Sequence, residues 1–175
     1  CNCRKFCRKP SLMAKKENIL ISLDSCHAKK IYSGSKRVEL RRRTMHIPPG
    51  TTMWIYEKIP VGSITGSATV TAIYTASPEE LWGRFRSISG LPKAEFFDYF
   101  ANVKVACALV LDNVQTLHSP LSLKSLREVT SNFQPPQFFI RLTDEHPVLL
   151  TLRTEANWGN ESLSSPSLLH IPCSC

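Results

Sequence analysis

Two long runs of β-forming residues, separated by a stretch that favours helices, most constrain the fold. Residues 67–76 are rich in Thr, Val and Ile, and residues 103–114 form the clearest strand pattern in the chain. Between the runs, Ser77, Pro78 and Glu80 fit a capping box with proline at the first helical position, which predicts a helix to about Arg86. Strands outnumber helices and do not alternate with them, so the predicted class is α+β with a mainly antiparallel, curved sheet.

Shorter patterns complete this prediction. Strands are expected at residues 18–23, 36–43 and 51–58 and near 138–142, and helices at residues 25–31, 92–99 and 122–129. Gly62 and Gly66 flank the start of the first long run and suggest a bend or bulge there. We expect one domain over residues 13–153, preceded by a flexible, basic, Cys-containing arm at residues 1–12 and followed by a flexible Ser/Pro-containing tail at residues 154–175.

Positive charge is concentrated at one end of the chain. The formal net charge is +8, and residues 1–43 hold thirteen Lys and Arg against three carboxylates. The remainder holds nine Lys and Arg against eleven carboxylates. A basic face or arm is typical of proteins that bind nucleic acid, although a solvated charged face without a partner has the same composition.

The seven cysteines, an odd number without an even framework of spacings, favour a reducing compartment over a secreted disulfide scaffold. Cys26 and Cys107 fall within a predicted helix and a predicted strand, where small core residues are expected. The other five lie near the ends and lack the Cys-x2-Cys spacing of a zinc site: Cys1, Cys3, Cys7, Cys173 and Cys175. We therefore expect no metal and no other cofactor.

The sequence contains neither a membrane span nor a common catalytic fingerprint. Its apolar runs fall short of the roughly 20 residues that cross a bilayer, and we expect no signal peptide. It has no Gly-x-Ser-x-Gly elbow, phosphate loop or dinucleotide fingerprint, and its five histidines lack metal-ligand spacing. We expect a cytoplasmic (intracellular) monomer that does not contact membranes.

The most informative segment runs from Gly34 to Arg41. Gly34 is expected to end a helix, after which strand alternation puts Glu39 and Arg41 on one face, with Lys36 at the turn. Lys36 and Arg41 can then hold a phosphate while Glu39 accepts hydrogen bonds from a base. A solvated strand face with one weak ion pair explains the same pattern, and spacing alone favours this plainer interpretation.

Here the sequence resembles the ASCH family (activating-signal-cointegrator homology) of PUA-like domains. The resemblance runs from about Asn18 to Leu142, and its most specific part is the pattern Gly-x-Lys-x-x-Glu-x-Arg, which ends at Arg41. Further matches are Ile55, Tyr56, Pro60, Pro135, Pro136 and Gln137. The resemblance implies a small closed β-barrel with short peripheral helices and a cleft that binds RNA or a nucleotide-like ligand. The ligand-binding residues it implies are Lys36, Glu39, Arg41, Tyr56 and Gln137, with Tyr56 stacking on the ligand or lining the cleft.

The sequence departs from the family pattern at three places. Asp24 and Ser25 stand where members often carry a basic residue and proline. Some relatives are amidohydrolases that deacetylate acetylated cytidine with a Lys, a Thr and a Glu; Glu39 stands in the threonine's place, and residues 87–90 supply no carboxylate. A carboxylate beside Lys36 holds the lysine protonated, which argues against that chemistry.

Three functions therefore stay open. The first is non-catalytic binding of RNA or a nucleotide-like ligand, with a regulatory role as one option. The second is a small hydrolase acting on RNA or a modified nucleoside, in which Lys36 acts with Glu39, or with Tyr32 or Tyr56. The third is an interaction module in transcriptional coregulation that contacts protein partners through the terminal arm. A hydrolase needs a nucleophile or base beside Lys36, whereas a binding module needs only charge and a stacking surface.

Overall fold

The computed structural model describes residues 16–161, so the predicted arm at residues 1–12 and residues 162–175 of the predicted tail lie outside the described residues. Within the described range the fold is a mixed α+β structure with one six-stranded sheet and five helices. The elements are β1 (Asn18–Leu23), α1 (Ser25–Tyr32), β2 (Val38–Arg41), β3 (Thr51–Glu57), β4 (Ser63–Ala76), α2 (Pro78–Phe85), α3 (Lys93–Tyr99), β5 (Ala106–Ser122), α4 (Leu123–Val129), β6 (Ile140–Arg141) and α5 (Pro147–Glu161).

The sheet has the strand order β2-β5-β4-β3-β1-β6. All neighbouring pairs are antiparallel except β1 and β3, which are parallel. The predicted α+β class and mainly antiparallel sheet are confirmed. The pairings leave β2 and β6 at the two edges, so the sheet is not closed and the predicted closed barrel is not confirmed.

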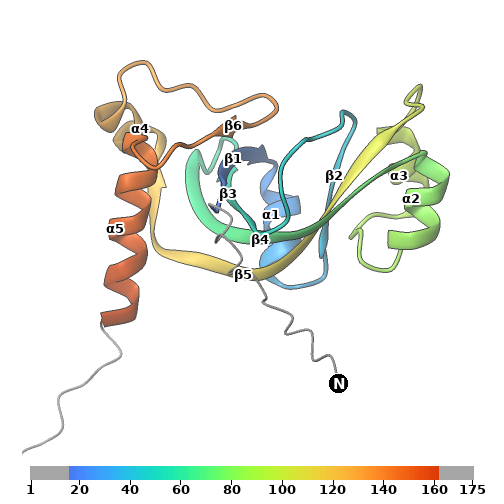
Figure 1. Cartoon of the computed structure of the whole chain (residues 1–175), viewed down its shortest axis with the longest axis horizontal. Helices are drawn as coiled ribbons and strands as arrows, with labels where there is room; N and C mark the ends of the chain where they lie inside the picture. Colours follow the sequence, from blue (N-terminus) through green and yellow to red (C-terminus); the bar gives the residue numbers. More distant parts are fainter. Residues whose placement is uncertain (1–15, 162–175) are drawn as a thin grey trace, which may run out of the picture.

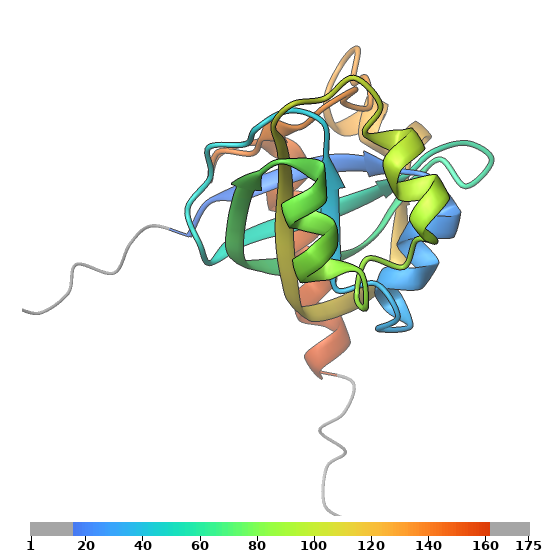
Figure 2. The ribbon, with the colours of Figure 1, turned by 90° about the vertical axis from the view of Figure 1, so that its right-hand side faces the viewer.

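The two longest strands, β4 and β5, run side by side across the molecule and curve as they go (Figures 1 and 2). Their register shifts between Ile64 and Gly66, where the sequence predicted a bulge. A Cβ atom at Gly66 would lie 2.3 Å from the carbonyl oxygen of Gln115, so this close approach of two backbones requires glycine.

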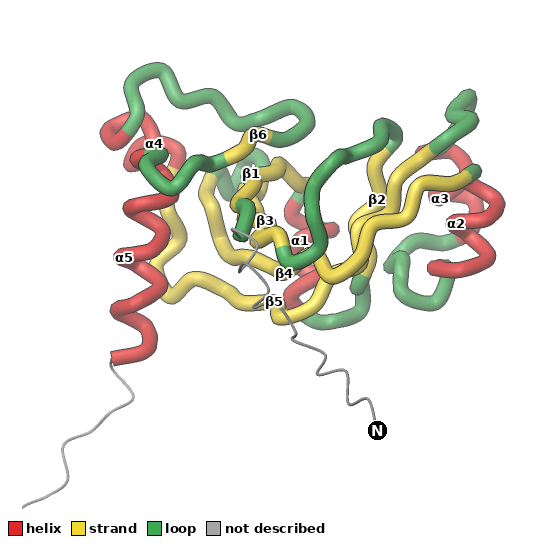
Figure 3. Tube along the Cα trace, viewed as in Figure 1, coloured by secondary structure: helices red, strands yellow, loops and turns green. Residues whose placement is uncertain are grey.

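The helices gather at the two ends of the sheet, with α1 against its middle (Figures 1 and 3). Helices α2 and α3 cover a cluster that includes Val38, Leu40 and Phe96, and α4 and α5 cover a second cluster that includes Leu20 and Trp54. A third cluster, which includes Ile19 and Ile31, fills the space between α1 and the sheet. Both faces of β1, β2 and β3 are therefore buried.

The predicted helices are confirmed within a few residues. The capping box at the start of α2 is present, with the Ser77 side chain accepting from the Glu80 amide and Glu80 accepting from the Ser77 amide. The strand predicted at residues 103–114 is longer than expected, because β5 continues to Ser122 along β4 and then leads into α4, whose N-cap is Ser122.

The sequence predicted no helix between residues 143 and 161, but α5 spans Pro147–Glu161, and Val148, Leu149 and Leu152 in its first turns anchor it to the core. The looseness of the tail expected from residue 154 stays a prediction. Cys26 is exposed on α1 and is not a core residue, whereas Cys107 is buried as expected.

None of the described helices has the length and apolar character needed to cross a membrane.

Candidate functional site

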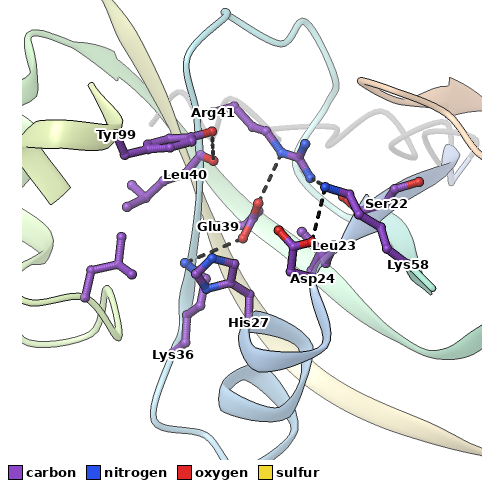
Figure 4. A pocket seen from close by; sticks show the side chains of 11 residues that line it. Ser22, Leu23, Asp24, His27, Lys36, Glu39, Leu40, Arg41, Lys58 and Tyr99 are labelled. Atoms are coloured by element: carbon purple, nitrogen blue, oxygen red, sulfur yellow. Dashed lines mark hydrogen bonds and ion pairs between the residues drawn. The ribbon is translucent and has the colours of Figure 1, made fainter. Parts of the chain in front are cut away.

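A small cavity of about 140 Å³ lies where the end of β1, the start of α1 and the edge strand β2 meet (Figure 4). The loop after α2, the end of α3 and the β3–β4 turn complete its wall. Its lining residues are Ser22, Leu23, Asp24, His27, Lys36, Glu39, Leu40, Arg41, Lys58, Leu91 and Tyr99. Charged and polar side chains dominate this lining, which distinguishes it from the apolar clusters around it.

Strand β2 brings Glu39 and Arg41 together as its alternation predicted. Val38 and Leu40 face the cluster under α2 and α3, so Glu39 and Arg41 face the opposite side, toward the cavity. Their exposure was not predicted correctly. Lys36, Glu39 and Arg41 are only 2%, 5% and 9% exposed. The curved sheet and α1 cover this face of β2, which the spacing of its residues alone had suggested to be solvated.

Lys36 lies at the floor of the cavity beside the loop that follows α2. Its ammonium lies 3.6 Å from the Glu39 carboxylate and donates a hydrogen bond to the carbonyl of Ser89. Lys30 donates to the next carbonyl, that of Gly90, at 2.7 Å. Gly90 has φ +68, and a Cβ atom there would lie 3.0 Å from the Cβ of Lys36, so glycine allows the loop to approach Lys36. The loop thus contributes two backbone carbonyls that accept hydrogen bonds from Lys36 and Lys30.

Glu39 lies between the two cations of the site. Its second oxygen lies 3.1 Å from Arg41 Nε, an ion pair in which the N–H is not aligned for a hydrogen bond. Arg41 also donates a long hydrogen bond of 3.4 Å to the carbonyl of Ser22. The free energy lost when three charges are removed from water exceeds the free energy gained from such partial pairing. A row of this kind therefore does not stabilise the fold. Arg41 also retains donor capacity for a ligand.

His27 projects from α1 toward Lys36 and Glu39 (Figure 4). Burial lowers the pKa of His27 below its usual value, and the neighbouring Lys36 ammonium lowers it further. Its Nδ1 is buried and has no hydrogen-bond partner among the described residues. His27 therefore presents a neutral imidazole near pH 7, which can accept one proton.

The mouth of the cavity is formed by more exposed groups. Lys58, from the β3–β4 turn, pairs with Asp24 at 3.3 Å, and both side chains are more than half exposed. Asp24 occupies the N-cap position of α1 but makes no capping hydrogen bond with its side chain, which turns to Lys58 instead. Tyr99, at the end of α3, is 38% exposed and donates a hydrogen bond to the carbonyl of Leu40. Burial raises the pKa of Tyr99.

Two predicted ligand-binding residues do not line this cavity. Tyr56 is 1% exposed and packs with Leu20 and Trp54 in the cluster under α4 and α5, so the structure does not bring it to the cavity as the sequence predicted. The alternation of β3 is regular, but both faces of this strand are buried and its apolar pattern does not reveal which one meets the cleft. Gln137 is exposed and lines a neighbouring cavity that also contacts Arg41.

The two tyrosines considered as partners of Lys36 in hydrolysis are both poor bases. Burial raises the pKa of Tyr32 to about 12, and its hydroxyl forms a 2.6 Å hydrogen bond with the hydroxyl of Thr65. Burial also raises the pKa of Tyr56. Neither lines the cavity that contains Lys36.

Sequence reasoning missed His27, Lys58 and Tyr99 as site residues. They come from α1, a turn and α3, and only the tertiary fold brings these segments next to β2. The one available signal was the position of His27 one turn after the end of a buried strand. In the described residues, no group of three or more His, Cys, Asp or Glu side chains could hold a metal ion.

Comparisons with known proteins agree with this architecture. Residues 18–133 match a family model described as a domain of unknown function, DUF365. An ASCH domain-containing ribonuclease of Zymomonas mobilis is 36% identical over 130 residues, which cover 74% of this chain and 87% of that protein. The crystal structure of ASCH from Zymomonas mobilis has a TM-score of 0.72 at 36% identity and covers 77% of this chain and 94% of its own. A Pseudomonas putida protein shares the fold, with a TM-score of 0.51 at 15% identity, over 77% of this chain and 97% of its own.

Proposed function

The chain belongs to the ASCH domain family, and from this premise we propose that it binds single-stranded RNA, with one nucleotide held in the cavity that contains Lys36, Glu39 and Arg41. The observation that carries the proposal is the buried charged row at the cavity floor. Buried charges that are only partly paired are unfavourable for stability, which favours a role in ligand binding, and the Zymomonas mobilis relative is named a ribonuclease. A nucleotide-like ligand presents the same groups and is the monomeric form of this substrate class.

The floor of the cavity suits the edge of a nucleobase. Glu39 offers carboxylate oxygens that accept hydrogen bonds from an exocyclic amino group, and Lys36 offers a donor to a ring carbonyl. Because all three side chains are almost fully buried, hydrogen bonds to them are stronger than on an open surface. Their rigid arrangement supports selection among bases.

The mouth of the cavity suits the sugar and phosphate. The exposed Lys58–Asp24 pair contributes little to stability, so a phosphate can compete with Asp24 for Lys58 at small cost. The partly exposed ring of Tyr99 offers a surface on which a base can stack. The mouth of the cavity thus binds the phosphate and the floor selects the base, which together form a site for one nucleotide of a single RNA strand.

A second candidate function is cleavage of RNA in the same cavity. The name of the Zymomonas mobilis relative and the unpartnered His27 favour it. A neutral His27 would take the proton of the ribose 2′-hydroxyl, whose oxygen attacks the adjacent phosphorus and breaks its bond to the 5′-oxygen. That oxygen takes a proton from water, and the products are a 2′,3′-cyclic phosphate and a 5′-hydroxyl. This chemistry needs a base that is unprotonated at the working pH, and the lowered pKa of His27 keeps its imidazole neutral there.

The test follows binding and products in one sample. Homopolymeric single-stranded RNAs of the four bases are titrated at rising salt with a chelator present, and products are analysed by mass. Binding should weaken with salt, and Lys58→Ala should lower the affinity and reduce the slope by ~0.7, the value for one contact on a single strand. Lys124→Ala removes an exposed lysine of α4, away from the cavity, and serves as the matched control.

The outcomes separate the candidates. Salt-sensitive binding without products supports a binding module. Products that carry a 2′,3′-cyclic phosphate, with turnover reduced about 100-fold or more in His27→Gln, support cleavage. Binding that responds equally to Lys58→Ala and Lys124→Ala would overturn the assignment of RNA to this cavity.

A further inference from the structure

A second cavity, of about 240 Å³, adjoins the first one. It is lined by Arg41, Arg42, Arg43, Tyr99, Gln137 and Phe138. Arg41 and Tyr99 line both cavities, so these two side chains stand at the boundary between them. A ligand held in the first cavity therefore has a second cavity directly beyond Arg41 and Tyr99.

The lining of the second cavity is basic and contains no carboxylate, whereas the first cavity contains Asp24 and Glu39. Arg42 is held in place by hydrogen bonds of 3.0 Å from its two terminal nitrogens to the carbonyls of Tyr99 and Ala101. Arg43 is exposed and has no ion-pair partner among the described residues. This chemistry suits a phosphate.

The opposite wall supplies a flat apolar surface and an amide. Phe138 is partly exposed, packs against the cluster under α1 and contacts the Phe139 ring at a centroid distance of 5.0 Å. The ring is therefore held by the core while part of it faces the cavity. The exposed amide of Gln137 stands beside it and can both donate and accept hydrogen bonds. Arginines beside an aromatic ring are the usual surroundings of a nucleotide in a single strand.

We propose that the second cavity binds the neighbouring nucleotide of the same RNA strand, so that the ligand is a polynucleotide and not a free nucleoside or nucleotide. The proposal rests on the proposed function. The phosphate that links the two nucleotides lies at Arg41, the boundary residue. Arg43 binds the next phosphate, and Phe138 stacks with the second base.

The experiment measures affinity for a short single-stranded RNA at several salt concentrations in four variants of the full chain. Arg43→Ala reports on the second cavity and Lys58→Ala on the first. Arg86→Ala removes an exposed arginine beyond the end of α2 and is the control for Arg43. Gln137→Ala, also at an exposed position, removes a polar contact of the second cavity without touching the core.

The expected result is a loss of affinity for Arg43→Ala, with a salt slope reduced by ~0.7, while Arg86→Ala behaves as wild type. Gln137→Ala should weaken binding without changing the slope. Arg43→Ala and Gln137→Ala should leave the affinity for a mononucleotide unchanged, because a mononucleotide occupies only the first cavity.

Each other outcome decides between the two proposals. Binding that responds to Lys58→Ala but not to Arg43→Ala overturns the second nucleotide and leaves the proposed function intact. Binding that responds to neither variant overturns both proposals. Binding that responds to Arg43→Ala alone, or mononucleotide affinity that falls in Arg43→Ala, also overturns the division into two adjacent subsites.

Discussion

The ammonium of Lys36 and the carboxylate of Glu39 lie 3.6 Å apart, and their side chains are only 3% and 6% exposed. Such a pair differs from a surface salt bridge because each ion has lost its water and depends on the other. The pair is therefore fixed in place, and it presents a charged but rigid floor to the cavity. This arrangement leads to predictions on stability and on ligand binding.

Lys36→Ala should lower the free energy of unfolding by about 3–5 kcal/mol, because it leaves the Glu39 carboxylate buried with one partner removed. Urea unfolding followed by circular dichroism measures the change. Lys58→Ala breaks the exposed pair with Asp24 and should change the same quantity by less than about 1 kcal/mol. Equal losses in the two variants would show that the buried pair has no special energetic role.

Gly90→Ala should weaken RNA binding as well as folding. Both Gly90 and Gly34 have positive φ, so alanine at either costs about 1–2 kcal/mol of backbone strain. A Cβ atom at Gly34 meets nothing within 4 Å, whereas at Gly90 it lies 3.0 Å from the Cβ of Lys36. Only Gly90→Ala should therefore displace Lys36 and reduce affinity beyond the loss of stability. Similar RNA affinities in the two alanine variants would contradict this account of the loop.

The stability of the protein should fall as the pH drops below about 6.5, the usual pKa of histidine. The folded state lowers the pKa of His27, so in this pH range the unfolded chain binds a proton that the folded chain does not, and acid favours unfolding. His27→Gln should reduce this fall in thermal midpoints measured across pH. His118→Gln, at an exposed position on β5, should leave it unchanged. A pH profile unaltered by His27→Gln would contradict the burial of a neutral imidazole.

Tyr99→Ala should weaken RNA binding by about 1–3 kcal/mol if one base stacks on its ring. Tyr99→Phe keeps the ring and removes only the hydroxyl, which donates to the carbonyl of Leu40, so its affinity should stay near wild type. Fluorescence anisotropy with labelled RNA measures both. Equal losses in the two variants would assign the effect to the hydroxyl and not to stacking.

The sequence predicted the secondary structure better than the site. Alternation placed Glu39 and Arg41 together because strand periodicity is a local property. Their burial depends on α1 and on the curvature of the sheet, and the sequence of β2 does not contain this information. The face of β3 on which Tyr56 lies was not evident from the sequence for a related reason, since both faces of this strand are buried.

Sequence spacing could not predict which residues from distant segments of the chain line the cavity. Tyr99 is 58 positions from Arg41 in the chain, yet both line the same cavities. Helix α5 was also not predicted, because the residues that anchor it to the core, Val148, Leu149 and Leu152, lie only in its first turns.

The most direct test of the central claim is to map the RNA on the protein by backbone amide chemical shifts in a titration with a short single-stranded RNA. The account predicts the largest shifts at residues 36–41, at His27 and Lys58 around the first cavity, and at Arg43 in the second. Shifts confined to the larger cavity of about 510 Å³ beside Tyr74 and Arg84, with none at residues 36–41, would contradict it.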